Sequence, residues 1–365
     1  MWNYYLPTKV MLESGLLKKN SDLLSGFGKK AIIATGRNSA KKSGALDDVL
    51  NCLKKTKIEY VIFDKIMENP SFECAEEGTA FAVENNCDFV IAIGGGSPLD
   101  AAKAMAVLAV YPEWKSENLF TDKIEKALPL IAIPLTSGTG SEVTPFSILT
   151  DRNNNKKGFG SDFIFPKLSI LDPEYTLTMS EEVTVSTALD ALTHSIEGEL
   201  KNFSENPVIK MMSLSATKTI KEKLEELVKN PNNVELRKQI QEASMLAGIV
   251  ITHCGTTIVH SAGYPLSSFL NVKHGLANAI YLIQIFSRVE KQNPQLVKNA
   301  IEPFYSLKEL EDFFDRLKVY DIELKINKDV IETWAKNVQE NQKSKKTPGD
   351  FDMIFYKSLY ERYSD

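Results

Sequence analysis

An aspartate and a histidine stand four residues apart in the segment DALTHSIEGEL, which spans residues 190–200. On a helix, this spacing brings the side chains of Asp190 and His194 together on one face. A carboxylate beside an imidazole suits three arrangements: a surface ion pair, a helix-capping contact, or half of a metal site. The other histidines of the chain help to decide between them.

The chain has only four histidines, and the other three, His253, His260 and His274, fall within one short stretch. Asp190 and His194, joined by two of these imidazoles, would form a site with three nitrogens and one oxygen. Such a donor set suits Fe²⁺, Zn²⁺, Co²⁺ or Ni²⁺ and does not suit Mg²⁺ or Ca²⁺. Buried structural histidines are the alternative, and the clustering favours the metal site.

A glycine-rich turn in FVIAIGGGSPLDAAKAMAVLAV leads from an apolar run directly into a helical pattern. Consecutive glycines let backbone N–H groups approach a pyrophosphate, and the start of the helix adds partial positive charge. We expect Ser97 to cap this helix, with Pro98 in its first turn. A plain strand-to-helix connection is the alternative, because the spacing differs from the GxGxxG fingerprint. The candidate dinucleotide contacts here are Gly94, Gly95, Gly96, Ser97 and Asp100.

A hydroxyl-rich loop, PLTSGTGSEVTPFSILTD, follows the next apolar run along the chain. Small hydroxylated side chains can wrap phosphates and ribose, whereas a simple serine/threonine turn is the alternative. Two such loops at adjacent strand ends favour a dinucleotide site. The candidate contacts from this loop are Thr136, Thr139 and Ser141.

The segment ATGRNSAKK indicates which dinucleotide would bind. An NAD site usually places a carboxylate at the ribose 2′-hydroxyl, whereas an NADP site accommodates the 2′-phosphate with cationic groups. Here Gly36 follows the apolar run, and no carboxylate appears before Asp47. This pattern favours NADP(H) over NAD(H), with a solvated basic turn as the alternative. The polar and basic candidates in this segment are Arg37, Ser39 and Lys41.

Strand and helix patterns alternate through the first half of the chain. The compact β-branched runs lie at 29–36, 59–64, 87–96 and 128–140. Strands that alternate with helices predict a mainly parallel sheet with helices on both faces. Ligands bind at the carboxyl ends of the strands in such sheets, which is where the glycine turn and the hydroxyl-rich loop stand.

The second half of the chain is a succession of helical patterns from Ser180 onward, without strand alternation. We therefore expect an α/β dinucleotide-binding domain over residues 1–178 and an all-helical metal-binding domain over 179–365. We expect the lysine-rich segment at 339–351 to be a solvated turn.

Composition limits the class of protein. The chain has 365 residues, of which 43% are hydrophobic and 25% charged, as is typical of a soluble globular protein with room for two domains. A net charge of −5 with both signs interleaved argues against nucleic-acid or membrane partners. The four cysteines form no CxxC pair, and neither a signal peptide nor a membrane-length apolar run is found. These features predict a cytoplasmic enzyme.

The sequence resembles the iron-containing (group III) alcohol dehydrogenase family over essentially its whole length. The similar stretches are GGGSPLDAAKA (94–104), PLTSGTGSEVTPFSILTD (134–151), LDPEYT (171–176), DALTHSIEG (190–198) and HSAGYPLSSFLNVKHGLANAI (260–280). The resemblance implies a dehydroquinate-synthase-like two-domain fold, with metal and nicotinamide meeting in the interdomain cleft. The metal ligands that it implies are Asp190, His194, His260 and His274. The dinucleotide contacts that it implies are the GGGS turn, Asp100, Thr136, Thr139 and Lys157.

The chain departs from the family pattern at two positions. Many members carry a further histidine four residues after the third metal ligand, where this chain has Tyr264. A phenol has an ordinary pKa of about 10, so Tyr264 would be a poor base without help from the metal. We expect proton exchange with solvent to pass through metal-bound water, Tyr264 or His253. At Gly36, NAD-preferring relatives similar to lactaldehyde reductase have an aspartate, which again favours NADP(H).

The resemblance implies reversible hydride transfer between NADP(H) and a small alcohol or aldehyde. Fe²⁺, or another divalent metal such as Zn²⁺, would polarise the substrate oxygen. One alternative is a non-redox, dehydroquinate-synthase-like enzyme on the same fold. Another is a dehydrogenase for a charged substrate, similar to maleylacetate or phosphonoacetaldehyde reductases. The family also implies a homodimer, which could form through an edge strand at residues 2–12.

Overall fold

The computed structural model describes residues 1–203 and 205–364, whose contacts group into two compact units. The α/β unit combines Tyr5–Ser180 with Asn230–Met245. The helical unit combines Met1–Tyr4, Glu181–Lys229 and the chain from Leu246 onward. Our sequence-based domain limits, 1–178 and 179–365, stay a prediction.

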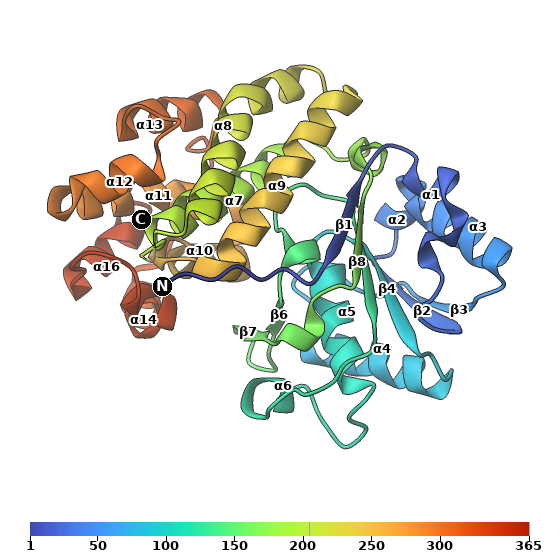
Figure 1. Cartoon of the computed structure of the whole chain (residues 1–365). Helices are drawn as coiled ribbons and strands as arrows, with labels where there is room; N and C mark the ends of the chain where they lie inside the picture. The colour runs from blue at the N-terminus through green and yellow to red at the C-terminus, as the bar shows by residue number, and fades with distance from the viewer. Residues whose placement is uncertain (204, 365) are drawn as a thin grey trace. The chain divides into compact units, whose positions relative to one another are not determined.

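A six-stranded sheet forms the centre of the α/β unit, with the strand order β1-β8-β5-β4-β2-β3 (Figure 1). Every neighbouring pair in it is parallel, which confirms the predicted sheet type. The central strands are apolar on both faces, because helices cover both sides of a sheet of this kind. The strands are β1 (Lys9–Leu12), β2 (Lys30–Thr35), β3 (Glu59–Phe63), β4 (Phe89–Gly94), β5 (Leu130–Pro134) and β8 (Leu168–Leu171).

Side chains alternate between the two faces of each strand and so build two separate cores. Ile33 and Ile91 pack in one core with residues of α1 (Leu16–Lys19) and α3 (Ala45–Thr56). Ile32 packs in the other core with residues of α4 (Phe72–Glu84) and α5 (Gly96–Leu108). The shorter elements of this unit are α2 (Ser39–Lys42), α6 (Asn118–Thr121), η1 (Ser21–Leu24), η2 (Ser141–Val143), η3 (Asp162–Ile164) and η4 (Pro173–Thr176).

The second part of the hydroxyl-rich segment forms strand β6 (Phe146–Thr150), which pairs with β7 (Lys156–Gly160) in a small antiparallel hairpin. The sequence-based interpretation did not include it, because KKGFG lacks the β-branched character of the other strands. The hairpin packs against α5, the helix that follows the glycine turn.

The helical unit confirms the predicted all-helical second part of the chain. Helix α7 (Glu181–Leu200) is buried along most of its length and packs against α8, α11 and α12. Helix α9 (Val234–Cys254) belongs to the α/β unit up to Met245 and to the helical unit from Leu246. The other helices of this unit are α8 (Pro207–Lys229), α10 (Ile258–Phe269), α11 (His274–Gln292), α12 (Pro294–Ala300), α13 (Leu307–Arg316), α14 (Lys328–Glu340), α15 (Gln342–Lys345) and α16 (Met353–Glu361).

The expectation of a solvated turn at 339–351 is wrong. The segment contains the short helix α15, and the side chains of Ser344 and Thr347 are buried. The reason is that Thr347 Oγ1 accepts a hydrogen bond from the backbone N–H of Ile258 at 2.9 Å and so ties the segment to the start of α10.

In the part of the chain that the structure describes, no single helix has the length and hydropathy of a membrane span. Only α9 and α10 taken as a pair reach those limits of length and composition, and the pair is bent by 115°.

Candidate metal centre

Three helices bring the predicted metal ligands together. Asp190 and His194 lie one turn apart on α7, His260 lies on α10, and His274 is the first residue of α11. The first three are buried, whereas the side chain of His274 is 32% exposed. The i, i+4 pair on α7 therefore faces the interior of the unit, which excludes the surface ion pair.

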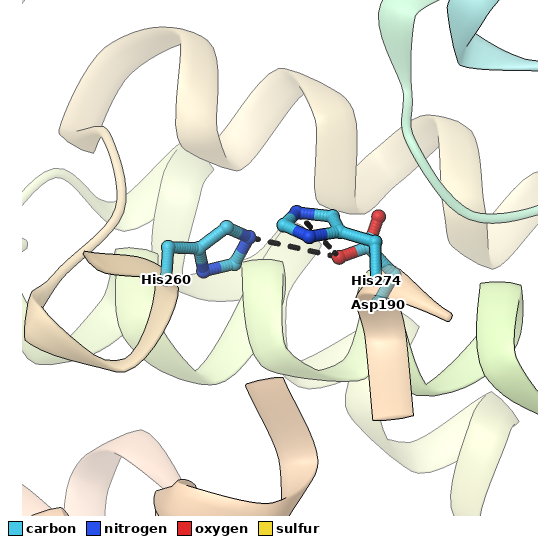
Figure 2. A group of neighbouring side chains, drawn as sticks. All are labelled: Asp190, His260 and His274. Atoms are coloured by element: carbon cyan, nitrogen blue, oxygen red, sulfur yellow. Dashed lines mark ion pairs between the residues drawn. The ribbon is translucent and has the colours of Figure 1, made fainter. Parts of the chain in front are cut away.

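The three histidines surround one carboxylate oxygen. Their Nε2 atoms lie 3.6 Å (His260), 3.7 Å (His194) and 3.8 Å (His274) from Oδ1 of Asp190. Figure 2 shows the side chains of Asp190, His260 and His274 converging on this oxygen. These separations are too long for hydrogen bonds. They approach the spacing of about 3.4 Å between ligands arranged tetrahedrally at about 2.1 Å from a metal ion.

An unpartnered nitrogen supports the same interpretation. Nε2 of His260 is buried and has no hydrogen-bond partner within residues 1–203 and 205–364. Leaving a buried polar atom unsatisfied costs about 1–3 kcal/mol, so a native protein rarely keeps one without a reason. A divalent cation bound by His260 would satisfy this atom. The residues present therefore fit a metal ion.

Glu197 holds His260 in the orientation that this requires. It lies on α7, is fully buried, and its Oε2 accepts a hydrogen bond from Nδ1 of His260. Its Oε1 accepts hydrogen bonds from the hydroxyl of Thr257 and, at 2.8 Å, from the backbone N–H of Thr257. A carboxylate at Nδ1 fixes the ring tautomer and leaves Nε2 available as a ligand atom.

The sequence-based interpretation missed Glu197. Its signal was the helical spacing, because Asp190, His194 and Glu197 follow one another on the same face of α7. Its burial could not be inferred from the sequence, because a glutamate in a helix usually faces solvent.

The charges of the buried side chains around Asp190 favour the binding of a cation. Burial alone would raise the pKa of Asp190, but the neighbouring histidines hold it well below its ordinary value. Burial lowers the pKa of His194 to about 4, so its imidazole is neutral at pH 7 and suited to a metal. Burial also opposes the protonation of His260, but Glu197 and Asp190 outweigh it and raise its pKa to about 9. The two buried carboxylates thus attract positive charge to this point.

A close contact between two helices sets the position of His274. A Cβ atom on Gly275 would lie 1.8 Å from the carbonyl oxygen of Ser186 and 2.7 Å from the backbone nitrogen of Asp190. The start of α11 therefore rests directly on the backbone of α7, and only glycine fits there. Nδ2 of Asn278, one turn further along α11, lies 3.1 Å from Oδ1 of Asp190.

The two residues proposed for proton transfer lie in different surroundings. The ring of Tyr264 stacks on His274 at 5.8 Å between centroids, and its hydroxyl accepts a hydrogen bond from Lys343. His253 stacks on Tyr4 at 4.9 Å, and its Nδ1 lies 2.9 Å from its own helix at Ile249 O. Tyr264 is thus next to a candidate ligand, and both proton roles stay predictions.

The glycine turn in the α/β unit differs in one detail from expectation. Gly95 is the N-cap of α5, so the expectation that Ser97 caps this helix is wrong. The helix begins at Gly96, and the hydroxyl of Ser97 instead accepts a hydrogen bond from the backbone N–H of Asn69 at 3.3 Å. Asn69, with a φ of 54°, had not been identified from the sequence.

The glycine turn contacts the hydroxyl-rich loop. A Cβ on Gly95 would lie 3.2 Å from the side chain of Thr136, and a Cβ on Gly96 would lie 2.9 Å from that of Thr139. The contact is tight because β4 and β5, which these loops follow, are neighbours in the sheet.

A buried lysine, also missed from the sequence, joins the same two segments. Nζ of Lys103 donates hydrogen bonds to the hydroxyls of Ser141 (2.8 Å) and Thr144 (3.2 Å) and to the carbonyl of Phe146 (2.7 Å). Asp100 accepts from the hydroxyl of Ser141 at 2.6 Å and from the backbone N–H of Ile148 at 2.9 Å. Burial lowers the pKa of Lys103 to about 8.

The remaining dinucleotide candidates lie at the surface of the α/β unit. Gly36 follows β2, and a Cβ on it would lie 3.2 Å from the carbonyl oxygen of Ile66. Lys157 lies on β7 and pairs with Asp151 at 3.3 Å. The exposed side chains around Gly36 and the helix α2 are Arg37, Ser39 and Lys41. The dinucleotide contacts of all these residues stay predictions.

Comparisons with known proteins agree with this architecture. The profile of "Iron-containing alcohol dehydrogenase" matches residues 7–173, and that of "Fe-containing alcohol dehydrogenase family, C-terminal" matches residues 184–360. The chain therefore belongs to the iron-containing alcohol dehydrogenase family, and it is an oxidoreductase that acts on CH–OH groups.

Individual relatives cover most of the chain. An NADPH-dependent butanol dehydrogenase of Clostridium saccharobutylicum is 31% identical over 95% of this chain and 85% of its own length. A long-chain primary alcohol dehydrogenase of Thermoanaerobacter ethanolicus is 33% identical over 80% of this chain and 74% of its own. The crystal structure of an iron-containing alcohol dehydrogenase from Thermotoga maritima is 37% identical, covers 100% of this chain and 99% of its own, and has a TM-score of 0.93.

Proposed function

We propose that this enzyme interconverts small alcohols and aldehydes by hydride transfer to and from NADP(H), with a divalent metal, Fe²⁺ or Zn²⁺, at the Asp/His group. The observation that carries the proposal is the convergence of three imidazole nitrogens on one carboxylate oxygen at 3.6–3.8 Å. The proposed ligands are Asp190, His194, His260 and His274.

Each part of the group has a task in this proposal. A divalent metal supplies Lewis acidity toward the substrate oxygen. Asp190 provides the negative charge that retains the cation, and Glu197 keeps the ring of His260 turned toward it. Tyr264, stacked on His274, stands where it could exchange a proton with substrate or solvent, either directly or together with His253.

The dinucleotide is assigned to the glycine turn and the hydroxyl-rich loop. Backbone N–H groups at the start of α5 would bind the pyrophosphate. The preference for NADP(H) is supported by the exposed Arg37 and Lys41 beside Gly36, where an NAD site would place a carboxylate. The name of the 31% identical butanol dehydrogenase, which is NADPH-dependent, points in the same direction.

The experiment that tests the function is a set of initial rates for the reduction of butanal. The enzyme is loaded with Fe²⁺ in the absence of oxygen and assayed with NADPH, with NADH, and after removal of the metal by a chelator. We expect turnover with NADPH to exceed that with NADH and to disappear with the metal. If the metal-loaded enzyme oxidises neither dinucleotide in the presence of butanal, the proposal is wrong for simple aldehydes.

We also propose a homodimer in the cytoplasm with small molecules, rather than nucleic acid or membrane, as partners. Light scattering coupled to size-exclusion chromatography would show a mass near twice 40.8 kDa.

A further inference from the structure

Lys343 is held close to the metal group by its backbone. It is the second residue of α15, and its N–H donates to the side chain of Asn341 at 2.9 Å. Its carbonyl accepts a hydrogen bond from the hydroxyl of Thr347 at 2.8 Å, and Thr347 in turn accepts from Ile258, the first residue of α10. The helix that carries His260 therefore also anchors Lys343.

The side chain of Lys343 points toward a candidate metal ligand. Its Nζ donates a hydrogen bond to the hydroxyl of Tyr264 and lies 4.8 Å from the centre of the Tyr264 ring. That ring stacks almost parallel on His274, with 9° between the planes. One aromatic ring thus separates the ammonium group from the Asp/His group.

The positive charge of Lys343 is not neutralised by the protein. The residue is half-buried, and within residues 1–203 and 205–364 no carboxylate forms an ion pair with it. Its hydrogen-bond partner is the hydroxyl of Tyr264 and not a carboxylate. A partly desolvated cation without a counter-ion is unfavourable by itself, and an anion brought beside it regains that energy.

Further cations lie nearby. Lys201, at the end of α7, is half-buried and donates to the carbonyl of Thr256 at 2.9 Å. Burial lowers the pKa of Lys201, the charge of Glu197 opposes this, and the charges of Lys343 and Lys346 lower the pKa further. The carboxylates of Asp190 and Glu197 would be balanced by a divalent metal. The loaded site therefore keeps a surplus of positive charge on the side of α15.

We propose that Lys343 binds an anionic group of the substrate, such as a carboxylate or sulfonate, a few bonds away from the carbonyl that is reduced. This inference rests on the proposed function, because it takes the Asp/His group as the place where that carbonyl lies. It narrows the substrate class to aldehydes that carry an acidic group.

The test compares butanal with 4-oxobutanoate, which have the same number of carbons and differ in the carboxylate. We expect the wild-type enzyme, loaded with Fe²⁺, to have a kcat/KM at least tenfold higher for 4-oxobutanoate. Lys343→Met should lower that value at least tenfold and leave butanal within twofold, whereas Lys343→Arg should retain the preference. Lys345→Met, on the exposed side of the same helix, is the matched control and should change neither value.

Binding of butanedioate, an unreactive dicarboxylate, is measured by calorimetry on the same metal-loaded proteins. We expect binding to the wild type and to Lys345→Met, and a loss of at least tenfold in affinity for Lys343→Met. If butanedioate binds as expected but neither aldehyde is reduced, the proposed function is wrong and the anion site at Lys343 still stands. Equal loss of activity on both aldehydes, or unchanged binding in Lys343→Met, would overturn the inference and assign Lys343 to the positioning of Tyr264.

Discussion

The two units each bury a cluster of charged side chains, and the clusters differ in how their polar atoms are satisfied. In the α/β unit, the ammonium of Lys103 donates to three oxygens, and both carboxylate oxygens of Asp100 accept hydrogen bonds. In the helical unit, three imidazoles stand 3.6–3.8 Å from Asp190, beyond hydrogen-bond distance, and Nε2 of His260 has no partner among the described residues.

The difference separates a structural cluster from a binding site. A buried charge that is fully hydrogen-bonded holds its neighbours in place without a ligand. A buried imidazole nitrogen without a hydrogen-bond partner, such as Nε2 of His260, indicates that a partner from outside the chain binds there. Lys103 therefore holds the hydroxyl-rich loop against α5, whereas the Asp/His group is a candidate site for a cation. The following variants test this distinction.

The largest effect is expected from His260→Ala, which removes the unpartnered nitrogen. Metal content, measured by elemental analysis after dialysis, should fall below a tenth of the wild-type value, because a site that loses one ligand binds weakly. Aldehyde reduction should fall by about 10³-fold or more, in line with the loss of several kcal/mol of Lewis-acid stabilisation. His253→Ala is the matched control for metal content and should keep its metal. A full equivalent of metal in His260→Ala would remove His260 from the ligand set.

A smaller effect is expected from Glu197→Gln, which keeps the volume of the side chain but weakens its hold on His260. Loss of a group that orients a ligand typically lowers metal affinity by about 10–100-fold. Competition with a chromophoric chelator measures this affinity directly, and circular dichroism shows whether the fold is kept. Unchanged affinity would mean that His260 does not depend on Glu197 for its orientation.

Lys103→Met should leave metal binding intact and act on the dinucleotide. The variant removes the donor of three buried hydrogen bonds, and each oxygen left without a donor costs about 1–3 kcal/mol. We expect the melting temperature to fall by about 5 °C or more and the KM for NADPH to rise, since the loop that carries Thr139 and Ser141 is released. Lys54→Met, at an exposed position of α3, is the control. Loss of metal from Lys103→Met would erase the difference between the two clusters.

The smallest effect concerns the pH dependence of stability and Glu142, a buried residue of the hydroxyl-rich loop. Burial raises the pKa of Glu142 from 4.5 to about 7, so the folded chain holds this proton more tightly than the unfolded chain. The stability that this proton contributes is present below pH 4.5 and is lost as the pH rises through 7. Glutamine does not titrate, so the Glu142→Gln variant does not lose stability in this way as the pH rises. Its melting temperature relative to wild type should therefore rise by about 2 °C or more between pH 5 and pH 8. A constant difference would contradict the raised pKa.

The sequence correctly predicted the features that depend on the local spacing of residues. The β-branched run at 29–36 became β2, and the i, i+4 spacing of Asp190 and His194 placed both on the inner face of α7. Strand β8 had no such signal, because LSIL is short and gains its place between β1 and β5 from pairing with distant segments.

Residues whose role depends on burial were missed. Lys103 and Glu197 look like surface residues of helices in the sequence, and only tertiary packing shows that both are enclosed. Lys343 belongs to a polar, lysine-rich segment that is typical of a solvated turn, and it is brought to Tyr264 by a hydrogen bond from Ile258 to Thr347. The local sequence pattern gives no signal of such a contact between distant segments.

The close approach of α11 to α7 at Gly275 has a consequence for the choice of metal. Because backbone rests on backbone there, the distance between His274 and Asp190 is set by a residue that never touches the ion. Any added atom at this position would push α11 away from α7 and so move His274 away from Asp190. If these residues bind the metal as proposed, a wider ligand set would favour larger ions, so substitutions at position 275 should change which metal is retained from a mixture.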